Sequence, residues 1–261
     1  MPRNQNIDKG REFDWGKTSP DYARFRDIYP DAFYEKIISL GLCTKGQAVL
    51  DIGTGTGVLP RHLSRFGASF TGVDISPQQI AEARRLSQGM DIRYTVSAAE
   101  EIDFPPNSFD VVTACQCFIY FDVPTLLPRI QTVLKDNGKF AIMYLAWLPE
   151  ESTIARMSEQ LVLRFNPDWT GAYMGRDAFG IPDWLEQYPF HVTGNVTFDL
   201  DIPFTRESWN GRMKACRGVG ASLPAPEIER FEDMHVEMLR QNAPDSFTIP
   251  HYAHILVLSR K

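Results

Sequence analysis

Short apolar runs alternate with segments of helical apolar spacing along the first 145 residues. Strands are predicted at 47–52, 69–74, 92–96, 111–115 and 140–145. Apolar positions three or four residues apart predict helices between them, at 58–66, 77–86 and 124–134. Strands that alternate with helices form a mostly parallel sheet that is covered on both faces, with right-handed connections. The pattern therefore predicts a doubly wound α/β fold.

Polar residues dominate positions 1–18, which are expected to be flexible. Ser19 and Pro20 are residue types that begin helices, and they precede the first predicted helix. A second helix is expected to begin at Pro30 and to end near Gly41.

The regular alternation of strands and helices ends near residue 149. Residues 150–165 have the spacing of an amphipathic helix, and residues 166–189 are rich in Trp, Gly, Pro and Asp without a clear period. The remaining predicted elements are a strand at 190–204, helical segments at 205–219 and 225–242, and a final strand at 252–258.

Three glycines alternate with threonines where the first strand ends, at Gly53, Gly55 and Gly57. Glycine lacks a Cβ, so it adopts positive φ and lets a ligand touch the backbone. A helix follows, and the free N–H groups of its first turn face the same place. The dinucleotide turn would need a glycine at Val58 or Pro60, and no Gly-Lys-Ser/Thr of a phosphate-binding loop follows. The spacing therefore disfavours a nicotinamide dinucleotide.

Four segments resemble, in order, the motifs of class I S-adenosylmethionine-dependent methyltransferases, of the type 11 kind that acts on small molecules. Residues 49–57 resemble the first motif, and residues 71–76, which include Asp74 at the end of a strand, resemble the second. Residues 108–112 resemble the signature of strand four, and residues 134–139 resemble the turn into strand five. This ordered set is far more specific than a glycine turn alone.

The resemblance implies a Rossmann-like sheet of seven strands whose last strand runs antiparallel. It implies one domain overall, in which residues 1–149 are the N-terminal helices and the cofactor-binding core. Two helical lid insertions are expected over the carboxyl ends of the strands, where open α/β sheets bind ligands. The insertions comprise residues 150–188 and 205–249, and the core strands that follow them comprise residues 189–204 and 250–261.

S-adenosyl-L-methionine is the cofactor that the resemblance implies, with S-adenosyl-L-homocysteine as its product. In the family the acid of the second motif binds both ribose hydroxyls, a role that falls on Asp74; capping of the helix that begins at Pro77 is the alternative. Asp51 is expected to orient the glycine turn or to reach the cofactor amino group through water. An arginine fork suits the cofactor carboxylate, which favours Arg26. The residues expected to bind the cofactor are Tyr22, Arg26, Asp51, Gly53, Thr54, Gly55, Gly57, Asp74, Ile75, Ala98, Ala99, Glu100 and Gln116.

Two positions depart from the pattern of the family. Ala98 stands where an acid often contacts the adenine, so backbone groups near Ala99 would serve instead. Ile119 stands where related sequences often carry a histidine, so the obvious base is missing. Tyr120 and His251 are the candidates for catalysis; a core aromatic and a structural histidine are the alternatives. The lack of an evident base favours an acceptor that is already nucleophilic.

Aromatic and basic side chains occur in the expected lid segments. Aromatic rings can enclose an apolar ligand pocket, although the lid's own core would need the same residue types. Arg212 and Arg217 suit an anionic substrate or surface ion pairs. The aromatic residues concerned are Trp147, Trp169, Tyr173, Phe179, Trp184 and Trp209.

Composition narrows the class of partner. The 261 residues carry a formal net charge of −6, which argues against a general nucleic-acid surface. No apolar run of about 18 residues is present, and the first residues lack the apolar core of a signal peptide. A cytoplasmic protein with a small-molecule partner, and without a nucleic-acid or membrane partner, is expected.

The cysteines are Cys43, Cys115, Cys117 and Cys216, and their spacing fits no zinc pattern, so no metal site is expected. Cys115 and Cys117 are expected to share one face of strand four. Reduced buried thiols are the simpler interpretation, and a thiophilic substrate or metalloid near strand four is the alternative.

The predicted function is transfer of the sulfonium methyl to a small-molecule acceptor by in-line displacement. A methyltransferase for RNA or protein is an alternative, which would need a basic or extended groove. A cofactor-binding regulator without turnover is a second alternative. The lid segments, rather than the motifs, would select the acceptor.

Overall fold

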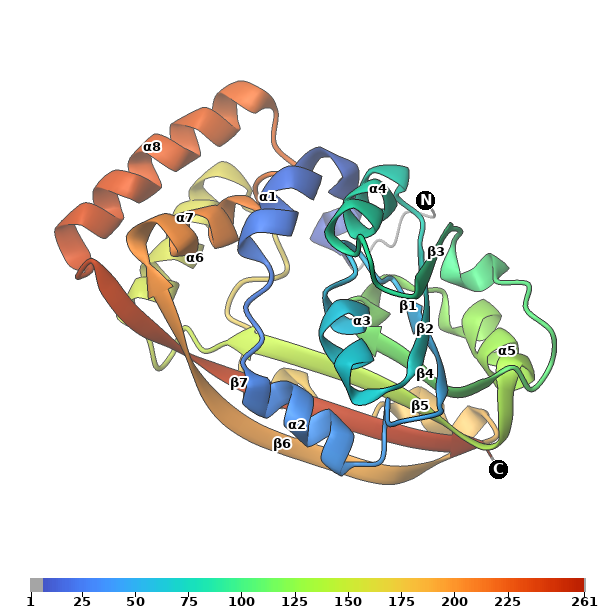
Figure 1. The fold of residues 1–261 in the computed structure, drawn as a ribbon. Coiled ribbons are helices and arrows are strands. Elements are labelled where there is room, and N and C mark those ends of the chain that lie inside the picture. The colour runs from blue at the N-terminus through green and yellow to red at the C-terminus, as the bar shows by residue number, and fades with distance from the viewer. Residues whose placement is uncertain (1–6, 261) are drawn as a thin grey trace. The chain divides into compact units, whose positions relative to one another are not determined.

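One sheet of seven strands organises the computed structural model, which describes residues 7–260 (Figure 1). Its order is β3-β2-β1-β4-β5-β7-β6, and the printed pairs among β1 to β5 are all parallel. The Lys139 side chain donates a hydrogen bond to the Ser259 hydroxyl, and the N–H of Leu148 donates one to the carbonyl of Pro250. Because the residue numbers rise from Lys139 to Leu148 while those of their partners fall from Ser259 to Pro250, β7 runs antiparallel to β5. This confirms the predicted fold class. The strands are β1 (Ala48–Ile52), β2 (Ser69–Asp74), β3 (Ile92–Val96), β4 (Phe109–Cys115), β5 (Leu134–Trp147), β6 (Phe190–Thr205) and β7 (Ser246–Arg260).

Two of the helices begin directly after a serine whose hydroxyl caps the helix N-terminus. The Ser76 hydroxyl accepts a hydrogen bond from the N–H of Gln79 before α4, and the Ser152 hydroxyl accepts one from the N–H of Ala155 before α6. The α-helices are α1 (Ser19–Phe25), α2 (Asp31–Ser39), α3 (Val58–Leu63), α4 (Pro77–Leu86), α5 (Val123–Val133), α6 (Thr153–Phe165), α7 (Arg206–Lys214) and α8 (Ala225–Asn242).

The chain divides into two compact units. Unit 1 comprises the described part of Met1–Ile28 together with Ala146–Ala178 and Asp199–Tyr252. Unit 2 comprises Tyr29–Leu145, Phe179–Phe198 and the described part of Ala253–Lys261. The division differs from the expected segments, because α1 groups with the expected lid segments and residues 179–188 group with the core. Unit 1 also takes in residues 146–149, 199–204 and 250–252, which were expected in the core.

The core of unit 2 forms around its parallel strands. Leu50 of β1 and Val112 of β4 are fully buried, as is Ile130 of α5, and all three belong to one apolar cluster. The centre of the Trp184 ring lies 5.5 Å from the centre of the Phe118 ring, which belongs to the same unit. Packing of this kind explains why residues 179–188, expected in a lid, belong to unit 2.

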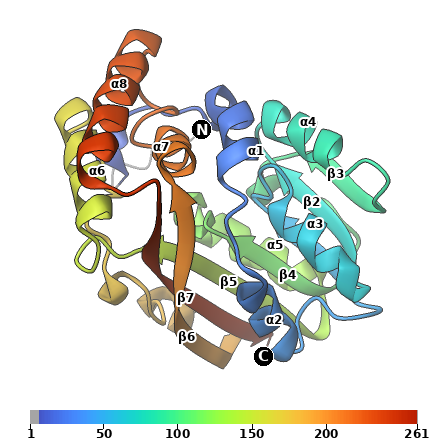
Figure 2. The same ribbon diagram turned by 60° about the vertical axis from the view of Figure 1, so that its left-hand side comes forward.

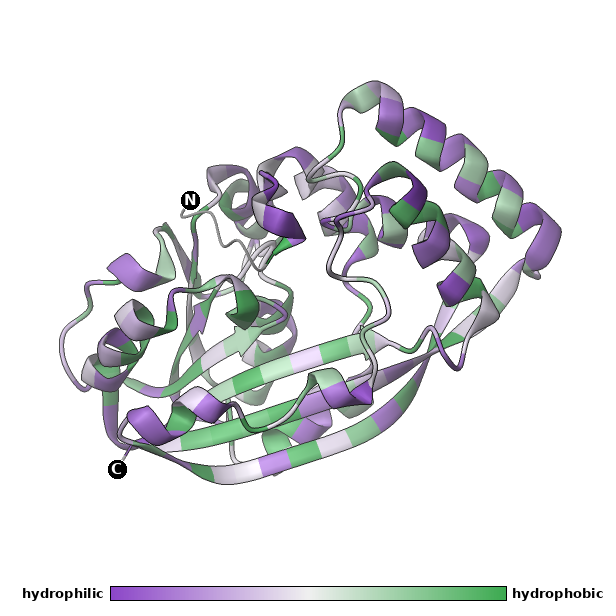
Figure 3. Cartoon of the chain, turned by 180° about the vertical axis from the view of Figure 1, so that it is seen from behind, coloured by the Kyte–Doolittle hydropathy of each residue, from purple (hydrophilic) through white to green (hydrophobic). Residues whose placement is uncertain are grey.

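Helices α6, α7 and α8 lie side by side in unit 1 (Figure 2), and hydrophilic and hydrophobic stretches alternate along α8 (Figure 3). A buried polar network joins the three helices. The Trp209 indole N–H of α7 donates to the Ser158 hydroxyl of α6 at 2.9 Å, and His235 of α8 bonds Ser158 at 2.9 Å and Asn210 at 2.8 Å. Each buried polar group thus finds a partner on a neighbouring helix.

Helix α1 packs against α7 in the same unit. A Cβ at Gly211 would lie 2.3 Å from a ring carbon of Phe25, so the glycine lets this ring approach the α7 backbone. The contact explains why α1 belongs to unit 1 and not, as expected, to the cofactor-binding core.

Residues 7–18 are folded into unit 1, although positions 1–18 were expected to be flexible. They form the turns η1 (Asp8–Gly10) and η2 (Trp15–Thr18). The buried carboxylate of Asp8 accepts hydrogen bonds from the Arg217 guanidinium at 2.8 and 2.9 Å. The partner stands 209 positions away in the sequence, so no local pattern announces this contact. Residues 1–6 of the expectation lie outside the described residues.

Several strands are longer than their apolar runs predicted, the fifth and the last by the most. The fifth strand, expected at 140–145, spans Leu134–Trp147, and the last, expected at 252–258, spans Ser246–Arg260. Backbone hydrogen bonds to a neighbouring strand do not require apolar side chains. They therefore continue these strands through polar residues, which a prediction from apolar runs leaves out. Within residues 7–260, no helix is both long enough and apolar enough to cross a membrane.

Candidate active site

The glycine turn joins the end of β1 to the start of α3 in unit 2. Gly53, Gly55 and Gly57 have φ angles of 63°, 55° and 73°, the left-handed region that favours glycine. The N–H of Thr54 donates to the carbonyl of Val73 at 2.9 Å, which ties the turn to β2. The three glycines are therefore required by the backbone of the turn itself.

Asp74 ends β2 beside this turn. Its Oδ2 accepts a hydrogen bond from the N–H of Gly55 at 2.9 Å, and its Oδ1 accepts one from the N–H of Ser76 at 2.9 Å. Burial raises the pKa of Asp74, and these two hydrogen bonds oppose the rise. Each carboxylate oxygen keeps a further lone pair, so the capping role and the expected ribose role are compatible.

Asp51 lies in β1, two positions before the turn, and is buried. Its Oδ1 accepts a hydrogen bond from the Thr113 hydroxyl of β4 at 2.6 Å. Burial raises the pKa of Asp51 to about 6, although the Thr113 bond opposes the rise. Sequence reasoning missed Thr113; the only signal is a polar residue within the apolar run of β4.

Replacing Asp51 with asparagine should raise the free energy of unfolding of the cofactor-free protein at pH 7.5, by at most about 3 kcal/mol. The folded pKa of about 6 exceeds the ordinary value of 3.8, so between these values the folded state holds a proton that the unfolded state has released. The stability associated with Asp51 is therefore lost as the pH rises through this window. Urea unfolding at pH 7.5 and pH 5 measures the difference, which should shrink at pH 5.

The control for this substitution is Asp110→Asn, which should lower stability at pH 7.5. Burial alone would raise the pKa of Asp110, but hydrogen bonds from Lys135 and from the N–H of Ala48 lower it below its ordinary value. Equal unfolding midpoints for Asp51→Asn and the natural protein at pH 7.5 would contradict the prediction.

Gly57 and Gly72 make room for the Tyr94 ring. A Cβ at Gly57 would lie 2.2 Å from the Tyr94 hydroxyl oxygen, and a Cβ at Gly72 would lie 2.8 Å from its ring. The Tyr94 hydroxyl is itself bonded to the Ser87 hydroxyl at 2.9 Å. Tyr94 therefore supports the third glycine of the turn, a role that the sequence did not reveal.

Replacing Gly57 with alanine should lower the free energy of unfolding by about 2–4 kcal/mol, because a positive φ costs an L-residue about 1–2 kcal/mol and Tyr94 must also move. Gly89→Ala is the matched control, since Gly89 has φ of 82° and nothing within 4 Å of an added Cβ. Denaturant unfolding measures both. Equal losses in the two variants would show that the Tyr94 contact contributes nothing.

The segment after β3 contains the expected adenine contacts. Ala98 precedes the turn η4 (Ala99–Glu101), and Ala99 is buried. The Glu100 carboxylate accepts a hydrogen bond from the N–H of Asp122 at 2.8 Å, so it holds the start of α5. Ile75, next to Asp74, is 43% exposed. The cofactor contacts of these residues stay predictions.

The end of β4 differs from expectation at the cysteines. Gln116 has φ of 65°, and its side-chain amide donates to the carbonyl of Leu145. Because β4 ends at Cys115 and Gln116 turns the backbone, Cys117 leaves the strand. The prediction of one common strand face for Cys115 and Cys117 was therefore wrong. A Cβ at Gly53 would lie 2.8 Å from the Cys117 sulfur, so this thiol packs against the glycine turn.

Tyr120 lies in the turn η5 (Phe118–Tyr120) that follows β4. It stands close enough to Tyr144 of β5 to interact electrostatically, and burial raises the pKa of Tyr144. Tyr144 is a polar-tipped residue that sequence reasoning did not single out. Ile119, at the position where relatives often carry histidine, is 41% exposed. A catalytic role for Tyr120 stays a prediction.

Tyr22 and Arg26, expected to bind the cofactor carboxylate, belong to unit 1. The Arg26 guanidinium carbon lies 4.6 Å from the centre of the Tyr22 ring, and Arg26 also donates to the Tyr22 hydroxyl at 3.4 Å. The predicted pair is thus brought together, and its role toward the cofactor stays a prediction.

The two arginines expected to meet a substrate or to form surface pairs are both buried in unit 1. Arg217 forms a buried ion pair with Asp8 and also donates to the Thr170 hydroxyl at 2.9 Å. The Arg212 guanidinium carbon lies 4.7 Å from the centre of the Trp147 ring. Surface ion pairs are therefore the wrong description of Arg217, because its side chain is 6% exposed.

Most of the aromatic residues expected in a lid form core. Trp169 and Trp209 are buried in unit 1, while Trp184 packs in unit 2. The Trp147 indole N–H donates to Glu159 at 2.6 Å. Tyr173, by contrast, is 51% exposed. These positions favour the lid-core interpretation over a purely aromatic ligand pocket.

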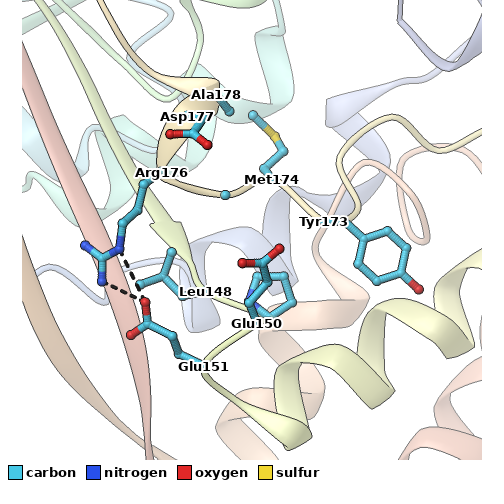
Figure 4. A pocket seen from close by; sticks show the side chains of 10 residues that line it. Leu148, Glu150, Glu151, Tyr173, Met174, Arg176, Asp177 and Ala178 are labelled. Carbon is cyan, nitrogen blue, oxygen red and sulfur yellow. Dashed lines mark hydrogen bonds and ion pairs between the residues drawn. The ribbon is translucent and has the colours of Figure 1, made fainter.

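A pocket of about 600 Å³ with a mixed polar and apolar lining lies in unit 1 (Figure 4). Arg176 is directed toward Glu151 and bonds it at 2.8 Å, and Arg176 also pairs with Asp199. Its guanidinium carbon lies 5.1 Å from the centre of the Tyr252 ring. The pocket is lined by Leu148, Pro149, Glu150, Glu151, Tyr173, Met174, Gly175, Arg176, Asp177 and Ala178.

His251 lies on β7 within unit 1 and is fully buried. Its Nδ1 bonds the carbonyl of Ile249 at 2.8 Å, and its ring stacks on Phe204 with centroids 6.0 Å apart. Burial, with a smaller contribution from the charge of Arg212, lowers the pKa of His251 to about 3, although the hydrogen bond to Ile249 opposes the fall. The imidazole is therefore neutral near pH 7, and its expected catalytic role stays a prediction.

Comparison with known proteins finds a methyltransferase domain in the chain. Residues 50–142 match the family model described as a methyltransferase domain. The chain is 35% identical over 166 residues to a ubiquinone biosynthesis O-methyltransferase of Bradyrhizobium diazoefficiens, covering 62% of this chain and 64% of that one. It is 31% identical over 140 residues to a protein of the same description from Xanthomonas euvesicatoria pv. vesicatoria, covering 52% and 59%. The match spans less than two thirds of the length of either relative.

Solved structures share the fold. The YcgJ protein of Bacillus subtilis aligns with a TM-score of 0.55 at 20% identity, over 89% of this chain and all of that one. A geranyl diphosphate C-methyltransferase of Streptomyces coelicolor aligns with a TM-score of 0.52 at 17% identity, over 88% and 76%. Residues 50–142 thus match a methyltransferase domain, and the strand order, the glycine turn and Asp74 resemble those of the class I S-adenosylmethionine-dependent methyltransferases.

Proposed function

We propose that this protein transfers the methyl group of S-adenosylmethionine to a small-molecule acceptor. One observation carries the proposal: the Asp74 carboxylate stands at the tip of β2 and is held by the N–H groups of Gly55 and Ser76, beside a turn of left-handed glycines. A ribose diol has two donors, and this carboxylate presents two oriented acceptors.

The residues of unit 2 suit the cofactor. Gly53, Gly55 and Gly57 leave the turn without side chains, so a ligand can approach the backbone N–H groups. Asp51 adds a carboxylate two positions before the turn, where it favours the positively charged methionine part of the cofactor when ionised. Asp74 would hold the ribose hydroxyls.

The bound cofactor supplies an activated sulfonium methyl, which an acceptor lone pair takes as the carbon–sulfur bond breaks and the electron pair stays on sulfur. The protein's part is to position the acceptor in line and to exclude water. The relatives named as ubiquinone biosynthesis O-methyltransferases support a small-molecule acceptor. The net charge of −6 supports the same choice over a nucleic acid.

Isothermal titration of the intact chain with S-adenosylmethionine and S-adenosylhomocysteine tests the proposal. We expect one cofactor per chain, and methyl transfer from labelled cofactor to at least one member of a panel of small hydroxyl, amine and thiol compounds. Absence of cofactor binding would refute the proposal. Cofactor binding without transfer to any acceptor would instead indicate a regulator without turnover.

A further inference from the structure

We propose that the Asp51 carboxylate of unit 2 distinguishes S-adenosylmethionine from its product S-adenosylhomocysteine by charge, and so favours the methyl donor over the spent product. The inference rests on the proposed function and adds a specificity-determining residue to it. The two ligands differ by one methyl group and one positive charge, because the sulfonium becomes a neutral thioether when the methyl leaves. A group that responds to this charge can therefore select between them.

Asp51 is a buried carboxylate without a positively charged partner. The residue is 2% exposed, and its Oδ1 accepts a hydrogen bond from the neutral Thr113 hydroxyl at 2.6 Å. Within residues 7–260 it forms no ion pair. Buried charges are normally paired, so an ionised Asp51 leaves a charge that a cationic ligand can neutralise.

The other groups that act electrostatically on Asp51 are neutral or negative. Burial raises the pKa of the two thiols and the tyrosine among them, so all three are uncharged between pH 5 and pH 7.5. The fourth group is a second carboxylate. Arg61 of α3 acts on Tyr94, and it forms no ion pair with Asp51. The four groups are Cys43, Asp74, Tyr94 and Cys117.

The register of the sheet brings Asp51 close to the expected position of the sulfur. Asp51 pairs with Gly72 on β2, two residues before Asp74, and the glycine turn begins two residues after Asp51. Asp74 would hold the ribose, and only one carbon atom separates the sulfur of the cofactor from the ribose ring. The sulfonium therefore stays near the end of β2 or of one of its neighbours.

Exposed apolar side chains indicate which neighbour that is. Ile75 and Val96 are 43% and 46% exposed, and Val96 of β3 pairs with Asp74. The flat adenine ring suits this apolar side of Asp74. The sulfur and the methionine part then extend to the opposite side, over β1 and the glycine turn. All of these residues belong to unit 2.

The charge of Asp51 is large enough to select between the ligands. Two opposite charges about 8 Å apart, at an effective dielectric constant of about 20, correspond to roughly 30-fold in affinity. When the carbon–sulfur bond breaks, the electron pair stays on sulfur and the positive charge of the ligand disappears. The ionised Asp51 then lacks its partner, which favours release of the product.

Isothermal titration with both ligands at pH 7.5 tests this selection in the natural protein and in Asp51→Asn. We expect the substitution to lower the ratio of S-adenosylmethionine affinity to S-adenosylhomocysteine affinity at least about tenfold. Sinefungin, which carries an amine in place of the sulfonium methyl, should behave as the charged ligand does. Asp51→Asn is expected to fold, because it should be more stable than the natural protein.

The pH dependence of the same ratio gives a second readout. Burial raises the pKa of Asp51 to about 6, so at pH 5 most of the unliganded protein carries a proton on this carboxylate. The ratio in the natural protein should therefore fall about fivefold between pH 7.5 and pH 5, and it should stay within about twofold in Asp51→Asn. The ribose contacts of Asp74 are common to both ligands, so their loss in acid cancels in the ratio.

Asp110→Asn is the matched control, because it removes one carboxylate from the same unit at the other end of β1. There Asp110 accepts a hydrogen bond from the N–H of Ala48 at 2.8 Å. Its affinity ratio should stay within about twofold of that of the natural protein.

Two results would overturn the inference alone: an equal affinity ratio in Asp51→Asn and the natural protein, or a ratio in the natural protein that does not change between pH 7.5 and pH 5. Both results require that the ligands bind, so they leave the proposed function intact. Absence of binding of either ligand would refute the proposed function, and this inference with it.

Discussion

Asp74→Ala is expected to weaken binding of S-adenosylmethionine at least about 100-fold. Hydrogen bonds to a charged group contribute roughly 1.5–3 kcal/mol each, and the proposal assigns two ribose hydroxyls to this carboxylate. The substitution also removes the acceptors of the Gly55 and Ser76 N–H groups, so the turn loses its anchor on β2. Isothermal titration of both proteins measures the effect.

Asp74→Asn separates the two causes of this loss. The asparagine oxygen can still accept one backbone hydrogen bond, so we expect an affinity between those of the natural protein and Asp74→Ala. Asp110→Asn, at the start of β4 in the same unit, should leave cofactor affinity within about twofold. Unchanged affinity in Asp74→Ala would remove the observation on which the proposed function rests.

The second large expected effect is a loss of folding stability at low pH. Between pH 7.5 and pH 5 the free energy of unfolding of unit 1 should fall by about 4 kcal/mol, of which His235 and His251 contribute about 2 kcal/mol each. Burial lowers the pKa of both histidines to about 3, against an ordinary value of 6.5. Below pH 6.5 the unfolded chain therefore binds protons that the folded chain does not.

The sign follows from the direction of these shifts. A histidine whose folded pKa is lowered contributes stability that is complete above pH 6.5 and is lost progressively as the pH falls toward 3. Asp51 acts in the opposite sense between pH 6 and 3.8, but it belongs to unit 2. The loss of stability in acid that His235 and His251 cause therefore falls within unit 1.

Tryptophan fluorescence during urea unfolding measures this difference, because four of the five tryptophans lie in unit 1. The variant His235→Gln should reduce the dependence of stability on pH by about one proton near pH 5. At pH 7.5 it should be less stable than the natural protein, because His235 bonds both Ser158 and Asn210. Identical urea midpoints at pH 7.5 and pH 5 would contradict the expected titration.

Local patterns were sufficient to predict several elements, the glycine turn and the carboxylate beside it. Apolar periodicity located β1, β2 and α4 to within one residue because burial of one face depends on spacing alone. The glycine turn was readable for a similar reason, since positive φ is a property of a single residue. Asp74 was readable because it ends a strand next to that turn in a known order.

Contacts between distant residues were not readable. Asp8 was assigned to a flexible segment because its partner, Arg217, stands 209 positions away. Thr113 of β4 supports Asp51, and Tyr94 of β3 supports Gly57; the only local signal for either contact is that Thr113 is polar within an apolar run. The common strand face expected for Cys115 and Cys117 failed because Gln116 adopts a left-handed backbone that its residue type does not require.

The sequence by itself thus determined the fold class, the glycine turn and the carboxylate beside it, because each depends on a pattern within a few residues. The tertiary structure alone decided which charged and polar groups are buried together. Burial in turn sets the pKa of Asp51 and His251 and leaves Nε2 of His251 without a partner. Desolvation depends on every element packed around a side chain, so no local pattern in the chain encodes it.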